Sequence, residues 1–178
     1  MKLYTIDKCY NNHLFIILSF MISISLNAQN KGSELKQMST EAEAIIIGKV
    51  VDLKSEWNKD KTQIVTDVTV FVDEYLKGSN RQKTIVVSHL GGEVDGVGEL
   101  YSHTPVFNSD EEVLLFIESN SENKMFLLGG EEGKLVIKNN PGDGVKLVGP
   151  NLSLTNVTAQ IKSYIAEKNE TLINNDNN

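Results

Sequence analysis

Residues 42–78 carry two long alternating patterns of apolar side chains, separated by one polar turn. Between residues 63 and 76, one face of the alternation is apolar except at Thr66 and Glu74, and its apolar members are Ile64, Val68, Val70, Val72 and Leu76. Successive side chains of a strand point to opposite faces, so this pattern predicts an antiparallel strand with one buried face. We expect the rest of the chain to fold around this strand and its partner.

The partner segment, residues 44–57, alternates less regularly, because Lys49 breaks the parity shared by Ile45, Ile47, Val51, Leu53 and Trp57. Gly48 comes just before the break, and a glycine inside a strand pattern often marks a bulge. Closing a small barrel demands tilted and coiled strands, which long, bent strands provide. Residues 58–61 contain an asparagine and an aspartate and are typical of the turn between the two strands.

Shorter elements are predicted on both sides of this pair. A short helix is expected over residues 33–43, and further strands over residues 83–90, 113–117, 125–128, 134–138 and 145–148. The glycine-dense residues 91–99 predict a tight hairpin or an exposed loop, after which residues 100–103 are expected to resume a strand. Beyond Pro150, an apolar stripe at helical spacing predicts a helix that docks on the strands, with members Val157, Ile161, Tyr164 and Ile165.

These elements together predict a mainly β fold. We expect a small OB-like antiparallel barrel with a short N-terminal helix and a C-terminal helix. An open β-sandwich is the alternative. Trp57, the only tryptophan, is expected in the core at one end of the barrel, the alternative being an exposed anchor for a partner.

Residues 1–28 have the features of a secretory signal peptide. Lys2 and Lys8 precede an apolar run over residues 14–26, which is short for a membrane span, and Ala28 is a small residue before a cleavage point. We therefore expect one domain over residues 29–169 and a disordered polar tail over residues 170–178. The expected location is secreted or periplasmic.

The expected mature chain is acidic and free of cysteine, because the only cysteine, Cys9, lies in the signal segment. Removing residues 1–28 leaves 15 basic and 23 acidic residues, so the net charge moves from −7 to −8. An acidic surface repels phosphate backbones, and we therefore expect no nucleic-acid partner. No second apolar segment approaches membrane length, so no membrane span is expected after removal of the signal.

The residues best suited to chemistry lie close together in the sequence. His89, Glu93, Asp95 and His103 are candidate metal ligands, with Glu99 between them, but their spacing matches no known metal motif. Ser88 and His89 are adjacent in a predicted strand, so their side chains point to opposite faces. No other serine or cysteine arrangement suits nucleophilic catalysis. The sequence therefore predicts no catalytic residue, no cofactor and no metal site.

Several segments together resemble an uncharacterised family of secreted bacterial domains. They are AEAIIIGKV at 42–50, TDVTVFVDEYLKGS at 66–79, GGEVDGVGE at 91–99, PVFNSDEEVLLFIES at 105–119 and GGEEGKLVI at 129–137. Their layout is similar to the amino-terminal domain of the tissue inhibitors of metalloproteinases, a five-stranded OB-type barrel. Those inhibitors coordinate the protease zinc through an amino-terminal cysteine. This chain has no such cysteine at Gln29, so the resemblance implies the fold but not the zinc-chelating mechanism.

Two hypotheses for function follow. The first is a secreted, non-enzymatic binding or inhibitor-like module, whose partner is a protein of the cell envelope or outside the cell. The second is an extracytoplasmic hydrolase or metal-binding protein that uses His89, Glu93, Asp95 and His103. The first is preferred, because the sequence contains no complete set of catalytic groups.

Overall fold

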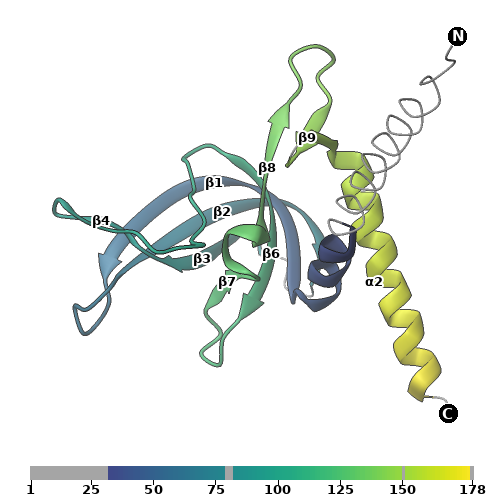
Figure 1. Cartoon of the computed structure of the whole chain (residues 1–178), viewed down its shortest axis with the longest axis horizontal. Coiled ribbons are helices and arrows are strands. Elements are labelled where there is room, and N and C mark those ends of the chain that lie inside the picture. Colours follow the sequence, from purple (N-terminus) through teal and green to yellow (C-terminus); the bar gives the residue numbers. More distant parts are fainter. Residues whose placement is uncertain (1–31, 79–81, 150, 177–178) are drawn as a thin grey trace, which may run out of the picture. The chain divides into compact units, whose positions relative to one another are not determined.

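The structure is a computed structural model that describes residues 32–78, 82–149 and 151–176. Its centre is a closed five-stranded barrel in which β1 pairs with β2, β2 with β3, β3 with β7, β7 with β6 and β6 again with β1 (Figure 1). The bounds of these strands are Ala44–Trp57 for β1, Ile64–Lys77 for β2, Thr84–Leu90 for β3, Glu112–Ser119 for β6 and Met125–Leu127 for β7. The predicted barrel is thus confirmed, and the open sandwich is not what forms.

The barrel differs from the prediction in one respect, because it is mixed rather than antiparallel. β3 and β7 run parallel and pair through Val87 and Met125, while the other four pairings are antiparallel. Strand direction must alternate around a fully antiparallel barrel, which is impossible for an odd number of strands. One parallel pairing is therefore a geometric consequence of closing five strands.

The barrel interior is filled by the apolar face that the alternation predicts. Val68, Val70 and Val72 of β2 point inward and pack with residues of every other barrel strand, namely Ile46, Val50, Ile85, Val87, Val113, Leu115, Ile117 and Leu127. β6 is buried on its other face as well, since Leu114 and Phe116 are fully buried. The continuous apolar run at 113–117 is therefore a strand buried on both faces, as expected.

The β1–β2 hairpin is bulged near Gly48 as predicted, with register shifts at Ile45/Ile46, Ile47/Gly48 and Val50/Asp52. A side chain at Gly48 would overlap the backbone of Phe71, so the close approach of the two strands requires glycine here. The sequence grouped Val51 with Ile45 and Leu53, but Ile46 and Val50 are the β1 residues in the barrel interior, and Val51, at the last shift, is exposed. Trp57, expected in the core, pairs with Ile64 and is half-buried.

Additional strands extend the barrel at two places. β4 (Gly92–Val94) and β5 (Val97–Glu99) form a separate hairpin, which settles the prediction for residues 91–99. β8 (Lys134–Asn139) pairs with the first half of β6 and continues into β9 (Lys146–Val148) and β10 (Leu152–Ser153). The strand expected over residues 100–103 is absent; a turn lies there, because His103 adopts a positive φ of 60° that breaks an extended backbone.

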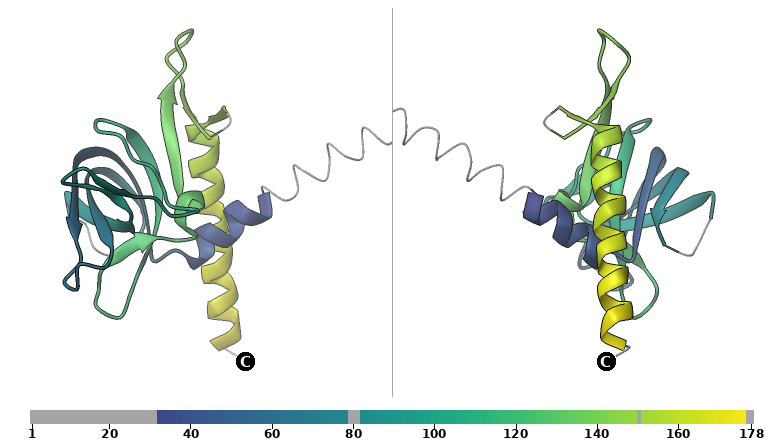
Figure 2. Two further views of the ribbon diagram at one scale, coloured as in Figure 1. Left: turned by 60° about the vertical axis from the view of Figure 1, so that its left-hand side comes forward. Right: turned by 90° about the vertical axis from the view of Figure 1, so that its right-hand side faces the viewer.

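A short helix covers residues 32–41, and α2 covers Leu154–Asp176. α2 contacts β2, β9 and β10 and buries Val157 and Ile161 (Figures 1 and 2), which confirms the predicted docking stripe. It continues past Asn169, so residues 170–176 are helical where a disordered tail was expected. Extending an existing helix costs far less than starting one, which explains why this polar segment stays helical.

The chain divides into two compact units, residues 1–37 and 38–178, and the barrel and α2 both belong to the second. The predicted signal segment, residues 1–28, lies outside the described residues. None of the described helices is long and apolar enough to cross a membrane.

Candidate functional site

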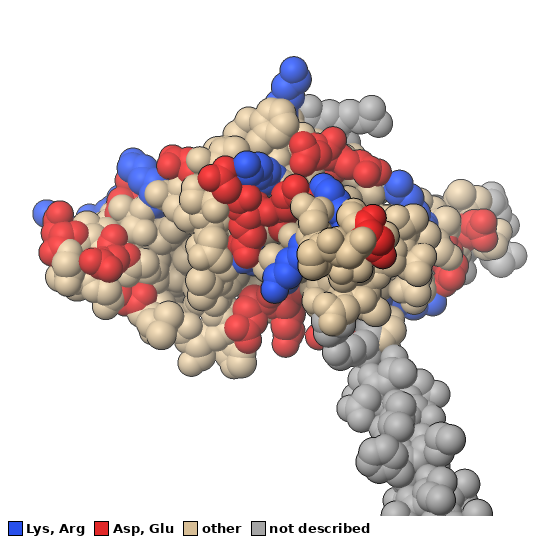
Figure 3. All heavy atoms as spheres, turned by 90° about the horizontal axis from the view of Figure 1, so that it is seen from above, with Lys and Arg blue, Asp and Glu red and all other residues tan. Residues whose placement is uncertain are grey.

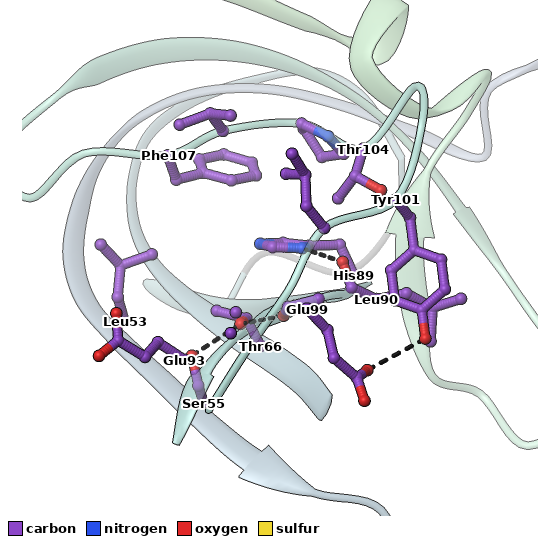
Figure 4. A pocket seen from close by; sticks show the side chains of 16 residues that line it. Leu53, Ser55, Thr66, His89, Leu90, Glu93, Glu99, Tyr101, Thr104 and Phe107 are labelled. Atoms are coloured by element: carbon purple, nitrogen blue, oxygen red, sulfur yellow. Dashed lines mark hydrogen bonds between the residues drawn. The ribbon is translucent and has the colours of Figure 1, made fainter. Parts of the chain in front are cut away.

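The candidate site is a cavity of about 760 Å³ at the end of the barrel where β1 ends and β2 begins (Figure 4). We call it the barrel-mouth cavity. Its walls come from the barrel end, from the β4–β5 hairpin and from the loop over residues 100–107, with lining residues that include Ser55, Thr66, His89, Glu93, Glu99, Tyr101 and Phe107. Cavities of roughly 300–1,000 Å³ are the usual size for ligand sites in proteins.

Two consecutive glycines fold the β4–β5 hairpin back onto the barrel. Gly91 and Gly92 have φ values of 91° and 136°, which residues with a side chain rarely adopt. The Thr66 hydroxyl donates to the Gly91 carbonyl oxygen at 2.6 Å and lies 2.8 Å from the Ser55 hydroxyl. A side chain at Gly92 would overlap both hydroxyl groups. Any other residue at position 92 would therefore require the hairpin or these two side chains to shift.

Glu99 ties the far end of the same hairpin to the barrel. One of its carboxylate oxygens accepts the backbone N–H of Ile64 at 2.8 Å and the hydroxyl of Tyr101 at 3.0 Å. The hydrogen bond to the Glu99 carboxylate is the main cause that raises the pKa of Tyr101, because ionising the phenol would destroy the donor. Glu99 is thus a structural anchor that also presents negative charge to the cavity.

Aromatic rings form one wall of the cavity. The rings of His89 and Phe107 are stacked, with centroids 5.9 Å apart and planes at 19°. The Lys134 ammonium lies 4.5 Å from the centroid of Phe107, bonds to Glu111 at 2.6 Å and also donates to the Val106 carbonyl. Because the Lys134 and Glu111 side chains are only 7% and 13% exposed, this arrangement holds the loop before β6 rigidly against the barrel.

Around the opening lies a ring of apolar side chains that are exposed to solvent. Leu100 is 90% exposed and Val106 is 69% exposed, and Leu53 and Leu90 are exposed to lesser degrees. We call these four residues the apolar rim. Single exposed apolar residues are ordinary on a protein surface, whereas several around one cavity are typical of interaction sites.

The charge of the cavity differs from that of the rest of the surface. Acidic and basic side chains lie next to one another over the face drawn in Figure 3, and ion pairs join Lys49 with Asp110 and Lys146 with Glu112. The cavity lining, by contrast, contains Glu93 and Glu99 but neither lysine nor arginine. Within the described part of the chain, Glu93 forms no ion pair. The cavity therefore presents uncompensated negative charge beside apolar surface.

The four candidate metal ligands do not converge. His89 and Glu93 line the barrel-mouth cavity, whereas Asp95 lies in the β4–β5 turn. His103 is exposed, and its Nδ1 lies 3.3 Å from a Glu131 carboxylate oxygen. Among residues 32–78, 82–149 and 151–176, no group of three or more histidine, cysteine, aspartate or glutamate side chains is arranged to hold a metal ion. The hydrolase or metal-binding hypothesis stays a prediction that gains no support from this geometry.

Ser88 and His89 occupy opposite faces of β3, as the strand geometry predicts. The Ser88 hydroxyl donates to Asp67 at 2.5 Å on the outside of the barrel, while Nδ1 of His89 lies 2.9 Å from the Leu90 carbonyl oxygen on the cavity side. The two side chains therefore do not form a catalytic pair.

Sequence reasoning did not single out the residues that shape the opening, namely Leu100, Tyr101, Val106 and Phe107. They lie in a segment without regular secondary structure, where no periodicity distinguishes a buried ring from an exposed one. The sequence predicts a resumed strand over residues 100–103 and no regular element over residues 104–107.

Comparison of the sequence with models of known protein families gave no match, and a search among curated proteins gave none either.

Proposed function

We propose that this chain is a non-enzymatic binding module that acts outside the cytoplasm and takes a protein partner at the mouth of its barrel. The observation that carries the proposal is the apolar rim, in which Leu100 and Val106 are largely exposed beside a preformed cavity. Fully burying one leucine or valine side chain contributes about 1.5–3 kcal/mol, so covering this rim supplies a large part of the energy that a stable complex needs.

The barrel mouth is also suited to binding without a rearrangement of its hairpin or its loop. Its hairpin is held by the Thr66 and Glu99 hydrogen bonds and its loop by Lys134 and Phe107. A surface that is already ordered loses little conformational entropy on binding, which leaves more of the contact energy as affinity.

The resemblance to the metalloproteinase inhibitors adds an expectation about the partner. An inhibitor-like module without an amino-terminal cysteine has no thiolate to place on a catalytic zinc. We therefore expect partner binding to depend on surface contacts at the barrel mouth. The predicted signal segment, residues 1–28, is the reason to seek the partner among secreted and cell-envelope proteins.

The test is capture of proteins from secreted and cell-envelope fractions on immobilised protein, with two double variants. Leu100→Asp with Val106→Asp places charge on the rim, whereas the matched control, Phe71→Asp with Val86→Asp, places the same charge on exposed positions of β2 and β3 outside the cavity. We expect a specific partner to be lost with the rim variant and kept with the control. Capture that is equal for both variants, with both folded by circular dichroism, would refute the proposal.

A further inference from the structure

We infer that the barrel mouth selects a partner segment in which a basic side chain stands between apolar residues. This inference rests on the proposed function and specifies the chemistry of its partner. Three features of the cavity carry it: uncompensated carboxylates in the lining, the exposed apolar rim, and an aromatic wall.

The first step is charge. Glu93 lines the cavity and has no ion-pair partner among the described residues, and the two hydrogen bonds to Glu99 both reach one of its oxygens. The nearby lysines are already engaged, because Lys54 pairs with Glu56 at 2.9 Å and Lys134 with Glu111 at 2.6 Å. A cation brought by the partner would therefore meet carboxylates that no basic side chain of the described chain neutralises.

The second step is shape. Glu93 and Leu53 both line the cavity, and the Glu99 carboxylate accepts the Tyr101 hydroxyl at 3.0 Å, so carboxylates share the lining with apolar and aromatic side chains (Figure 4). Lysine and arginine combine an aliphatic stem, which packs on apolar surface, with a charged end group that reaches a carboxylate or an aromatic ring. Leucine-like residues on either side of the cation would cover the rim.

The third step is discrimination. An acidic side chain at the same place would lie among carboxylates, and a neutral one would leave Glu93 without a partner while covering it from water. Specificity arises from such mismatches as much as from favourable contacts. The mouth therefore ranks segments by charge in the order basic, neutral, acidic.

The experiment uses three acetylated and amidated pentapeptides of pattern Gly-Leu-X-Leu-Gly, where X is lysine, glutamine or glutamate. Each is titrated into the isotopically labelled protein, and amide chemical shifts report both the dissociation constant and the residues affected. We expect the lysine peptide to bind about three- to five-fold more tightly than the glutamine peptide, as a partly exposed ion pair provides, and the glutamate peptide to bind most weakly. Added salt should reduce the difference.

Two variants with the same net charge locate the effect. Glu93→Gln removes the unpaired carboxylate from the cavity, and we expect it to remove most of the preference for lysine, the remainder being due to Glu99. Asp95→Asn removes one charge from the turn of the same hairpin, outside the lining, and asparagine tolerates the positive φ of 53° found there. We expect this control to keep most of the preference.

The outcomes separate this inference from the proposed function. The inference would be overturned if all three peptides bound at the mouth with equal affinity, or if Glu93→Gln left the preference for lysine undiminished. Either result would leave the binding module in place. Absence of shifts at the cavity with all three peptides would overturn it as well. The proposed function itself fails only if capture of the partner is insensitive to the rim variant.

Discussion

The two halves of β1 lie in opposite environments. In the first half, Ile45 and Ile46 are both fully buried, although neighbouring residues of a strand point to opposite faces. In the second half, Val51 and Leu53 are exposed, and the strand ends beside an open cavity. Both faces of the first half are therefore covered by other residues, whereas apolar side chains of the second half remain exposed to solvent. This contrast separates the part of the barrel that stabilises the fold from the part that is available for binding.

The largest effect is expected where burial is complete. Phe116→Ala removes a fully buried ring from the doubly covered strand β6, and we expect a loss of about 3–5 kcal/mol in the free energy of unfolding. Urea unfolding followed by circular dichroism measures it. Leu100→Ala, at the exposed mouth, should change stability by no more than about 0.5 kcal/mol. Comparable losses of unfolding free energy for the two variants would show that the buried strand and the barrel mouth do not differ in their contribution to stability.

The ion pair behind the aromatic wall should have the next largest effect. Glu111→Ala leaves the almost fully covered Lys134 ammonium without its carboxylate, and we expect a loss of about 2 kcal/mol. The same unfolding assay measures the loss. Glu112→Ala, which breaks the more exposed pair with Lys146, serves as the control and should cost under about 1 kcal/mol.

Substitution of Gly92 tests how far the position of the β4–β5 hairpin at the barrel mouth depends on one close contact. Gly92→Ala adds a side chain that overlaps the Ser55 and Thr66 hydroxyls, and it also strains the backbone, so we expect a loss of about 1–3 kcal/mol. Gly96→Ala shares the positive φ but meets open space, and it should cost about 1 kcal/mol. If amide exchange in β4 and β5 were unchanged by Gly92→Ala, the hairpin would not depend on this contact.

The smallest effect concerns pH. The hydrogen bond to Glu99 raises the pKa of Tyr101 above its usual value near 10, so the protonated phenol is favoured in the folded protein. Its contribution to stability is therefore complete below the unfolded pKa and is lost as the pH rises through the folded value. A Tyr101→Phe difference titration at 295 nm identifies its ionisation. Glu99→Gln should move that ionisation to lower pH, and an unchanged curve would contradict the assigned cause.

The sequence predicted the frame of this fold from local patterns. The alternation over residues 63–76 identified β2 and its inward residues, the run at 113–117 identified a doubly buried strand, and the stripe through Val157 and Ile161 identified the docking face of α2. Each of these signals repeats with the period of one element. Backbone geometry and the burial of apolar surface therefore suffice to interpret it.

The candidate site was predicted much less completely. His89 and Glu93 were singled out and do line the cavity, but Asp95 and His103 were grouped with them only because they are close in sequence. Tyr101 and Phe107, which shape the wall, carried no recognisable signal. Within a glycine-rich hairpin, residues that are close in sequence need not have side chains that are close in space, because positive φ angles turn the backbone sharply between them.

The sequence by itself predicted most of the strands and helices and the apolar faces of β2, β6 and α2, because side-chain periodicity is a property of each segment alone. The tertiary structure decided that five strands close with one parallel pairing, where the register of β1 shifts against β2, and which loop residues surround the cavity. Those outcomes depend on contacts between distant positions, such as the Ile64 N–H with Glu99, 35 residues apart. No local pattern encodes them, since they arise only when the chain closes on itself.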